Sequence, residues 1–318
     1  MPSALPVRTF AIIVSLACVA AGAALSPVAR AAQPVFKAES RLVVLHVSVR
    51  DRGGRYVTGL AQDAFTVIDD GQPQSLAMFS ADAVPASIGL LIDNSNSMGP
   101  SRERVIAAVS AFARHSHPQD EVFVLTVNEH VREAWAPAII AETRPERFEA
   151  AITTAITARG MTALYDGVAD GLRRLVRGAH TRQVLIVVSD GGDNASKARQ
   201  DDVVSAARAS NAAIYTVGLA DPLLRDGDPG FLKRLARETG GESFQPRNTN
   251  EVPPTLERIA RDIRSAYTLA YAPTPGLGPP TTEPRRRSVR VYVRSQDGHP
   301  VRVRARDGYL AEPDGSQR

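Results

Sequence analysis

The stretch "LLIDNSNSMGP" places small, oxygen-bearing side chains at alternate positions directly after an apolar run. Asp93, Ser95 and Ser97 are each separated by one residue. Such side chains satisfy the free N–H groups at a helix N-terminus, which here would belong to a helix starting near Pro100. They are also the oxygen ligands that a hard divalent cation takes. The stretch alone therefore leaves two interpretations open, helix capping and metal binding.

Two further oxygen-bearing residues occur at comparable points of the chain. Thr162 in "RGMTALYDG" precedes a helical pattern, and Asp190 in "IVVSDGGDN" follows an apolar run. Two carboxylates and three hydroxyls suit a hard ion such as Mg²⁺, which favours oxygen and keeps part of its water shell. Because a helix cap needs only one oxygen, the wider set favours metal binding.

The elements around these residues predict an α/β domain. From Ser87 to about Tyr267, apolar runs alternate with amphipathic helical stretches, which is typical of a parallel sheet covered by helices on both faces. Ligands bind outside the carboxyl ends of the strands in such sheets, where Asp93 and Asp190 are expected. The predicted strands are 87–93, 121–127, 183–190 and 212–219, and the predicted helices are 102–115, 145–156, 162–177, 201–210, 231–240 and 254–266.

Short strands are predicted on both sides of this α/β region. A few strands alone cannot bury enough apolar surface to be stable. We therefore expect both ends of the chain to join in one small β-sandwich, with the α/β domain inserted between them. The predicted boundaries are 36–82 for the N-terminal β segment, 84–267 for the α/β domain and 268–311 for the C-terminal β segment.

Residues 1–31 have the pattern of a signal peptide. An apolar, uncharged run at 10–25 follows a basic residue and precedes the A-x-A site at 29–31. We expect cleavage near Ala32, no transmembrane anchor afterwards, and export to the periplasm or the exterior. The only cysteine, Cys18, lies within this signal, so the mature chain would have no thiol chemistry. A lipoprotein attached at Cys18 is the alternative.

The charge distribution argues against a nucleic-acid partner. Cleavage would remove Arg8 and Arg30 and lower the formal net charge from +4 to +2. The remaining basic excess lies at 285–306, where arginines alternate with apolar residues as they do on a half-buried strand. We therefore predict a solvated arginine face there, and the expected export also disfavours nucleic acid.

Other chemistries fit the sequence less well. An EF-hand loop starting at Asp93 would need Gly and Glu where Met98 and Arg104 stand. The G-x-S-x-G elbow of a serine hydrolase is missing from the sequence. His115 and His117 are interpreted as part of a surface turn, and the acidic stretch "DPLLRDGDPG" as a polar loop that fits no calcium motif.

The order Asp93-x-Ser95-x-Ser97, then Thr162, then Asp190, resembles the metal-ion-dependent adhesion site (MIDAS) of von Willebrand factor type A domains. All five positions of its D-x-S-x-S…T…D pattern match. The flanking phrases, among them "VLHVSVRDRGGRYVTG" and "AYTLAYAPTPG", resemble the bacterial VWFA-related family of exported proteins. The resemblance implies a doubly wound, mostly parallel Rossmann-like sheet and a divalent cation on these five residues, with Mg²⁺ expected and Mn²⁺ or Ca²⁺ as alternatives.

The same resemblance implies an adhesion-type binding protein that is not an enzyme and has no catalytic residues. A carboxylate from an Asp or Glu of a protein partner would replace water on the ion, and the shift in ligation can be coupled to movement of the last helix. Two alternatives remain open. One is a metal-dependent hydrolase with Asp193 as its general base, and the other is an envelope protein whose metal only joins three loops. The sequence identifies neither the partner nor the oligomeric state.

Overall fold

A computed structural model describes residues 42–219, 227–274, 284–295 and 298–311. These residues all belong to one unit, Ser40–Arg318. The predicted signal peptide at 1–31 and two carboxylates of the acidic stretch, Asp221 and Asp226, lie outside the described residues. Within the described ranges, every helix is too short or too polar to cross a membrane.

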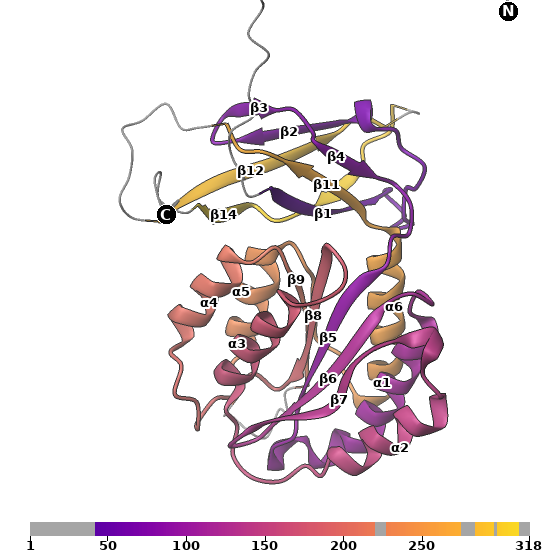
Figure 1. Cartoon of the computed structure of the whole chain (residues 1–318), viewed down its shortest axis with the longest axis vertical. Coiled ribbons are helices and arrows are strands. Elements are labelled where there is room, and N and C mark those ends of the chain that lie inside the picture. Colours follow the sequence, from indigo (N-terminus) through magenta and orange to yellow (C-terminus); the bar gives the residue numbers. More distant parts are fainter. Residues whose placement is uncertain (1–41, 220–226, 275–283, 296–297, 312–318) are drawn as a thin grey trace, which may run out of the picture. The chain divides into compact units, whose positions relative to one another are not determined.

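A six-stranded sheet forms the centre of the α/β region (Figure 1). Its order is β10-β9-β8-β5-β6-β7, and all neighbours are parallel except β7, which is antiparallel to β6. Strands β5, β6, β8 and β9 are almost wholly buried, as apolar runs in a sheet covered on both faces should be. The strands are β5 (Ala86–Asp93), β6 (Glu121–Val127), β7 (Val131–Ile139), β8 (Arg182–Ser189), β9 (Ala213–Gly218) and β10 (Ser243–Phe244). The predicted doubly wound sheet is confirmed.

Helices cover both faces of this sheet (Figure 1). Helices α1, α2 and α6 pack in the core on one face, and α3, α4 and α5 in the core on the other. A Cβ at Gly167 of α3 would lie 3.0 Å from a methyl carbon of Leu91, so α3 packs closely on β5. The helices are α1 (Arg102–His115), α2 (Pro145–Ala155), α3 (Leu164–Leu175), α4 (Gln200–Ala209), α5 (Pro229–Thr239) and α6 (Val252–Ser265), with 3₁₀ turns η1 (Gln62–Ala64), η2 (Asn96–Ser101), η3 (Ile140–Glu142) and η4 (Thr249–Glu251).

Strands from both ends of the chain form a β-sandwich. One sheet has the order β13-β1-β11-β4 and the other β14-β12-β2-β3, so each combines strands from before and after the α/β region. A shared core that includes Val47, Phe65 and Tyr267 packs between them. The α/β region is therefore inserted into this β domain, as predicted. The strands are β1 (Val43–Arg50), β2 (Phe65–Asp69), β3 (Gln72–Gln74), β4 (Met78–Ser80), β11 (Tyr267–Tyr271), β12 (Arg285–Val293), β13 (Arg302–Arg304) and β14 (Gly308–Ala311).

The buried carboxylate of Asp262, on α6, joins the β domain to the α/β region. Ser48 and Arg50 of β1 each donate a hydrogen bond of 2.9 Å to this carboxylate. It also accepts a bond of 2.6 Å from the Tyr215 hydroxyl and pairs with Arg304 of β13. Burial alone would raise the pKa of Asp262, but Arg304, Tyr215 and Arg50 together hold that pKa below its usual value. The two parts are thus held by a charge-assisted network as well as by apolar contacts.

The prediction of a solvated arginine face holds for part of the arginine-rich segment and is wrong for the rest. Arg287 and Arg306 are buried and Arg304 is half-buried, whereas the other arginines of the segment are exposed: Arg285, Arg286, Arg290, Arg294 and Arg302. Arg287 donates to the carboxylate of Asp69 at 2.8 Å, and Arg306 donates to three backbone carbonyls. Arg304 and Arg306 reach the α/β region, so protein covers the polar side at this end of the segment, while the exposed arginines face water as predicted.

Candidate metal centre

Asp93 is the last residue of β5. The order of the strands in the sheet reverses at β5, because later strands are added on both sides of it. β5 lies between β6 and β8, so the loops that follow β5 and β8 separate there and leave a crevice at the carboxyl edge of the sheet. Ile92 is paired in register with Val188 of β8. Asp93 and Asp190 therefore leave the sheet at the same edge, as the sequence predicts.

The carboxylate of Asp93 is fully buried, with 0% exposure. Its Oδ1 accepts a hydrogen bond from the backbone N–H of Ser95 at 2.9 Å, and its Oδ2 accepts one from the Ser189 hydroxyl at 2.6 Å. Burial raises the pKa of Asp93 to about 6, opposed by these hydrogen bonds and reinforced by the charge of Asp190. Among the described residues, neither carboxylate forms an ion pair with Lys, Arg or His. Two neighbouring carboxylates without a countercharge favour a cation.

Ser95 and Ser97 enter η2 directly after Asp93, and their hydroxyl oxygens lie 3.1 Å apart. Ser95 is the N-cap residue of η2 and Ser101 that of α1, yet neither side chain makes a capping hydrogen bond. The capping interpretation of this stretch is therefore not supported. The two hydroxyls instead lie together beside the buried carboxylate that precedes them.

Asn94 fastens the loop that leads to Thr162, a role that the sequence did not predict. Its side-chain oxygen accepts hydrogen bonds from the backbone N–H groups of Thr157 at 2.7 Å and Ala158 at 2.6 Å. Its backbone carbonyl accepts a further bond from the N–H of Arg159 at 2.7 Å. The loop before α3 is therefore held against the end of β5.

Thr162 is buried and is held by the loop that follows β8. Its N–H donates to the side-chain oxygen of Asn194 at 2.8 Å. Its carbonyl accepts from the N–H groups of Asn194 at 2.9 Å and Ala195 at 3.0 Å. The position of the threonine therefore depends on the loop that also carries Asp190. Asn194 stands four residues after Asp190 in "SDGGDN", and this proximity was the only sequence signal for it.

Asp190 begins a tight turn. Its Oδ1 accepts a hydrogen bond from the N–H of Gly192 at 2.9 Å. Gly191 has a φ of 89°, and a Cβ at this position would clash with the backbone of Asp228. Only glycine fits both constraints. The Gly191 N–H also donates to the hydroxyl of Ser189, which itself donates to Asp93, so the turn and the end of β5 share one hydrogen-bond chain.

The five predicted ligands thus occupy three loops at one edge of the sheet, and hydrogen bonds connect these loops. Within the described ranges there is no group of three or more His, Cys, Asp and Glu side chains that could hold a metal. A metal at this edge would need the hydroxyls as well as the carboxylates. Two negative charges and hard oxygen donors fit Mg²⁺, Mn²⁺ or Ca²⁺.

The other candidate groups have structural roles. The carboxylate of Asp193, the base of the hydrolase alternative, accepts from the N–H of Tyr165 at 2.9 Å and from the hydroxyl of Ser196 at 2.5 Å, and so caps α3. His115 and His117 lie before the amino end of β6, at the opposite edge of the sheet from Asp93. His117 lies in the connection between α1 and β6, as predicted, whereas His115 is the last residue of α1.

The α/β region is similar to a known domain family. The model of the von Willebrand factor type A domain matches residues 87–259. No curated protein matches the chain. Among solved structures, a von Willebrand factor type A protein from Catenulispora acidiphila has a TM-score of 0.52 and 11% identity, covering 88% of this chain and 74% of that chain.

Proximal thread matrix protein 1 from the mussel byssus has a TM-score of 0.51 and 14% identity, covering 62% of this chain and 51% of that chain. The chain therefore spans about half of the mussel protein's length. A further structure of that protein, described as having a zinc-occupied MIDAS motif, has a TM-score of 0.47 and 13% identity, covering 61% of this chain and 49% of that chain. At these identities the likeness is one of fold.

Proposed function

Because the chain belongs to the von Willebrand factor type A domain family, we propose that it is a metal-dependent binding protein. The observation that carries the proposal is the fully buried carboxylate of Asp93, which lies beside Asp190 without a cationic partner among the described residues. The proposed ligands are Asp93, Ser95, Ser97, Thr162 and Asp190. Magnesium is the proposed ion, with Mn²⁺ or Ca²⁺ as alternatives.

When bound, the cation supplies an electrophilic coordination position for the carboxylate of an Asp or Glu on a protein partner. The chain's own residues prepare this site. Ser95 and Ser189 orient the two oxygens of Asp93, and Asn194 sets the position of Thr162. The hydroxyl ligands are neutral. The two negative charges of the aspartates would therefore balance the charge of a divalent ion.

Binding is favoured over hydrolysis because the candidate base is engaged elsewhere. Asp193 accepts hydrogen bonds from Tyr165 and Ser196 at the start of α3, and its carboxylate is needed there. A general base must be free to reach the proton that it removes. We therefore propose no catalytic residues for this chain.

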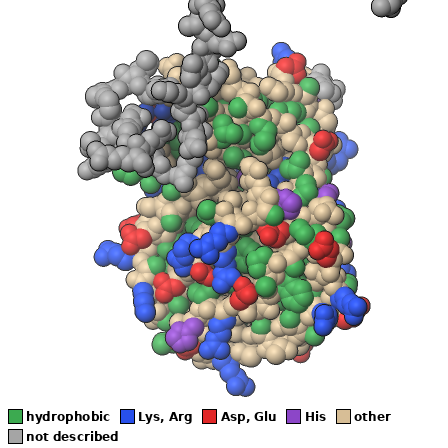
Figure 2. Space-filling view, viewed as in Figure 1, with side chains coloured by type: hydrophobic (Ala, Val, Ile, Leu, Met, Phe, Trp, Pro, Cys, Tyr) green, Lys and Arg blue, Asp and Glu red, His purple; other side chains and the backbone are tan. Residues whose placement is uncertain are grey.

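Export belongs to the same proposal. It rests on the apolar run and the A-x-A site within residues 1–31. A periplasmic or secreted protein would meet protein partners and not nucleic acid. The face in Figure 2 has acidic and basic side chains interspersed over the α/β region, so this face has no large area of one charge that would attract a polyanion.

Calorimetric titration of the purified protein with Mg²⁺ tests the site. The wild type should bind one ion, and Asp93→Asn and Thr162→Ala should bind it at least tenfold more weakly, because each removes a ligand. Thr154→Ala is the matched control, since Thr154 is exposed on α2 and bonds only to its own helix. Equal affinity in Thr162→Ala and Thr154→Ala would refute the assignment of Thr162.

A second experiment tests the partner. Immobilised protein should capture an envelope protein in Mg²⁺ and release it in excess chelator, and Asp93→Asn should fail to capture it. Attraction between exposed charges would instead fade with salt and survive chelation. Metal binding without any effect of metal on capture would identify a purely structural ion. Capture at full strength in chelator would refute the adhesion mechanism.

A further inference from the structure

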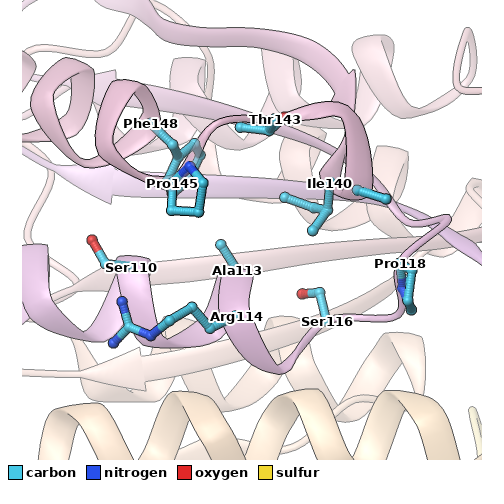
Figure 3. Close-up of a pocket in the computed structure, with 10 residues that line it drawn as sticks. Ser110, Ala113, Arg114, Ser116, Pro118, Ile140, Thr143, Pro145 and Phe148 are labelled. Carbon is cyan, nitrogen blue, oxygen red and sulfur yellow. The ribbon is translucent and has the colours of Figure 1, made fainter.

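A cavity lies at the opposite edge of the α/β region from Asp93. Figure 3 shows the residues that line it. Its lining comes from the C-terminal half of α1, the loop before β6, η3 and the start of α2. Asp93 stands at the carboxyl end of β5, whereas Ser116 and Pro118 of this lining precede the amino end of β6. The cavity has a volume of about 220 Å³ and is separate from the proposed metal site.

The body of the cavity is apolar. Ile140, Pro145 and Phe148 line it from η3 and α2, and Ala113 lies across from them on α1 (Figure 3). The volume is below the roughly 300–1,000 Å³ that is typical of sites for drug-sized ligands. The cavity is therefore suited to a small ligand with an apolar body.

One side of the cavity is polar. Ser110 and Arg114 lie one turn apart on α1 and so share a face of the helix. Ser110 is only 5% exposed, and its hydroxyl has no hydrogen-bond partner within the described residues. Buried hydroxyls normally have a partner. Arg114 is exposed, and across the described ranges it forms no ion pair or side-chain hydrogen bond.

The start of α2 lies at the same cavity. Pro145, its first residue, is part of the lining, and the N-cap residue, Arg144, makes no side-chain capping hydrogen bond. Pro145 has no N–H group, the N–H of Arg147 already donates to the carbonyl of Arg144, and Glu146 lies in the first turn, so this helix end adds little attraction for an anion. The exposed guanidinium of Arg114 is therefore the cationic group of this otherwise apolar cavity.

We propose that this cavity binds a small monocarboxylate with an apolar body. The carboxylate pairs with the guanidinium of Arg114, and the apolar body packs against Ile140 and Phe148. This binding is independent of the metal site, so failure of the proposed metal-dependent function would leave it intact.

The chain contains its own reporter for this binding. Trp135 is the only tryptophan, and its ring meets that of Phe148 edge-on at 5.3 Å between centroids. A ligand against Phe148 should change the tryptophan fluorescence. We would titrate the protein in excess chelator with 3-phenylpropionate, and with 3-phenylpropionamide as its neutral analogue. The carboxylate should give a saturable change with a Kd in the millimolar range or below, and the amide should bind more weakly.

Three variants locate the site. Arg114→Gln should weaken binding of 3-phenylpropionate about tenfold, as expected for loss of a charge-assisted hydrogen bond, and leave the amide unchanged. Arg104→Gln, an exposed arginine on the same helix outside the cavity, is the matched control and should change neither. Ala113→Leu should fill the cavity and weaken both probes. The proposal is overturned if no probe gives a saturable change, if acid and amide bind equally, or if Arg114→Gln behaves like Arg104→Gln.

Discussion

Replacing Asp93 with Asn should stabilise the protein in the absence of metal and abolish its stabilisation by Mg²⁺. Asp93 is buried and accepts two hydrogen bonds, from the Ser95 N–H and the Ser189 hydroxyl. Asparagine has nearly the same shape and keeps one acceptor for Ser95, while its amide can donate to Ser189. The substitution therefore removes the charge and preserves the packing.

The size of the effect follows from the pKa of Asp93. Its rise from 3.8 to about 6 means that the folded, metal-free protein binds this proton more tightly than the unfolded chain. The contribution to stability is full below about pH 4, is lost as pH rises through about 6, and stays lost above it. A shift of about two units corresponds to about 3 kcal/mol. Since the amide pairs less well than the carboxylate, we expect Asp93→Asn to gain about 1–3 kcal/mol at pH 7.5.

Urea denaturation in chelator, at pH 7.5 and at pH 4, measures this difference. The gain of Asp93→Asn should be present at pH 7.5 and nearly absent at pH 4. With Mg²⁺ at a hundred times its Kd, the wild type should gain about 2.7 kcal/mol and the variant almost nothing. Asp82→Asn, an exposed position between β4 and β5, is the control and should respond to neither. A variant less stable than the wild type in chelator at pH 7.5 would refute the reasoning.

Three further predictions concern the supporting residues. Asn194→Ala removes the acceptor for the Thr162 N–H, so Mg²⁺ affinity should fall about tenfold in calorimetry, and unchanged affinity would show that Thr162 is held without it. Asp262→Asn removes the buried carboxylate that pairs with Arg50 and Arg304, which leaves Glu242 as their remaining carboxylate partner among the described residues, and should lower the free energy of unfolding in urea by about 3 kcal/mol; a loss below about 1 kcal/mol would contradict this. Burial and two neighbouring arginines lower the pKa of His46 to about 3, so its contribution to stability is lost as pH falls from about 6.5 towards 3. The His46→Leu variant should therefore keep a flatter dependence of its urea midpoint on pH in that range, and parallel curves for wild type and variant would exclude the effect.

The central strands and helices could be predicted because their patterns are decided locally. β6 and α1 begin and end at the predicted residues, since one is a buried apolar run and the other an amphipathic helix between clear polar boundaries. β7 was not predicted. It contains Pro137 and several exposed side chains, and it is a strand only because it pairs with the edge of β6, where proline is tolerated.

The arginine-rich segment shows what local pattern cannot decide. The alternation of arginines with apolar residues correctly predicted strands with two different faces. It cannot predict which arginines of the polar face are covered by other parts of the protein. Arg304 faces a carboxylate on α6, and Arg306 faces carbonyls at the end of α4 and beyond, both distant in sequence. Burial of these cations became predictable only once the β domain and the α/β region were placed together.

Some residues of the candidate site could be predicted from the sequence and others could not. Asp93 and Asp190 could be placed at one edge because each follows a predicted parallel strand. Their role as metal ligands stays a prediction. Ser189, Asn94 and Asn194 were not predicted, because their roles depend on which loops meet at the edge of the sheet.

The insertion of the α/β region between β4 and β11 has a consequence for the order of folding. Asp69 and Tyr309, hydrogen-bonded in the β domain, are 240 positions apart in the chain. Closing a flexible loop of that length costs about 5 kcal/mol by chain statistics. If the α/β region folds first, its two ends bring β4 and β11 together and remove most of that cost. The β domain should therefore complete last, after the C-terminal strands have been synthesised, and until then the apolar face of β1 stays exposed to any chaperone that accompanies the chain.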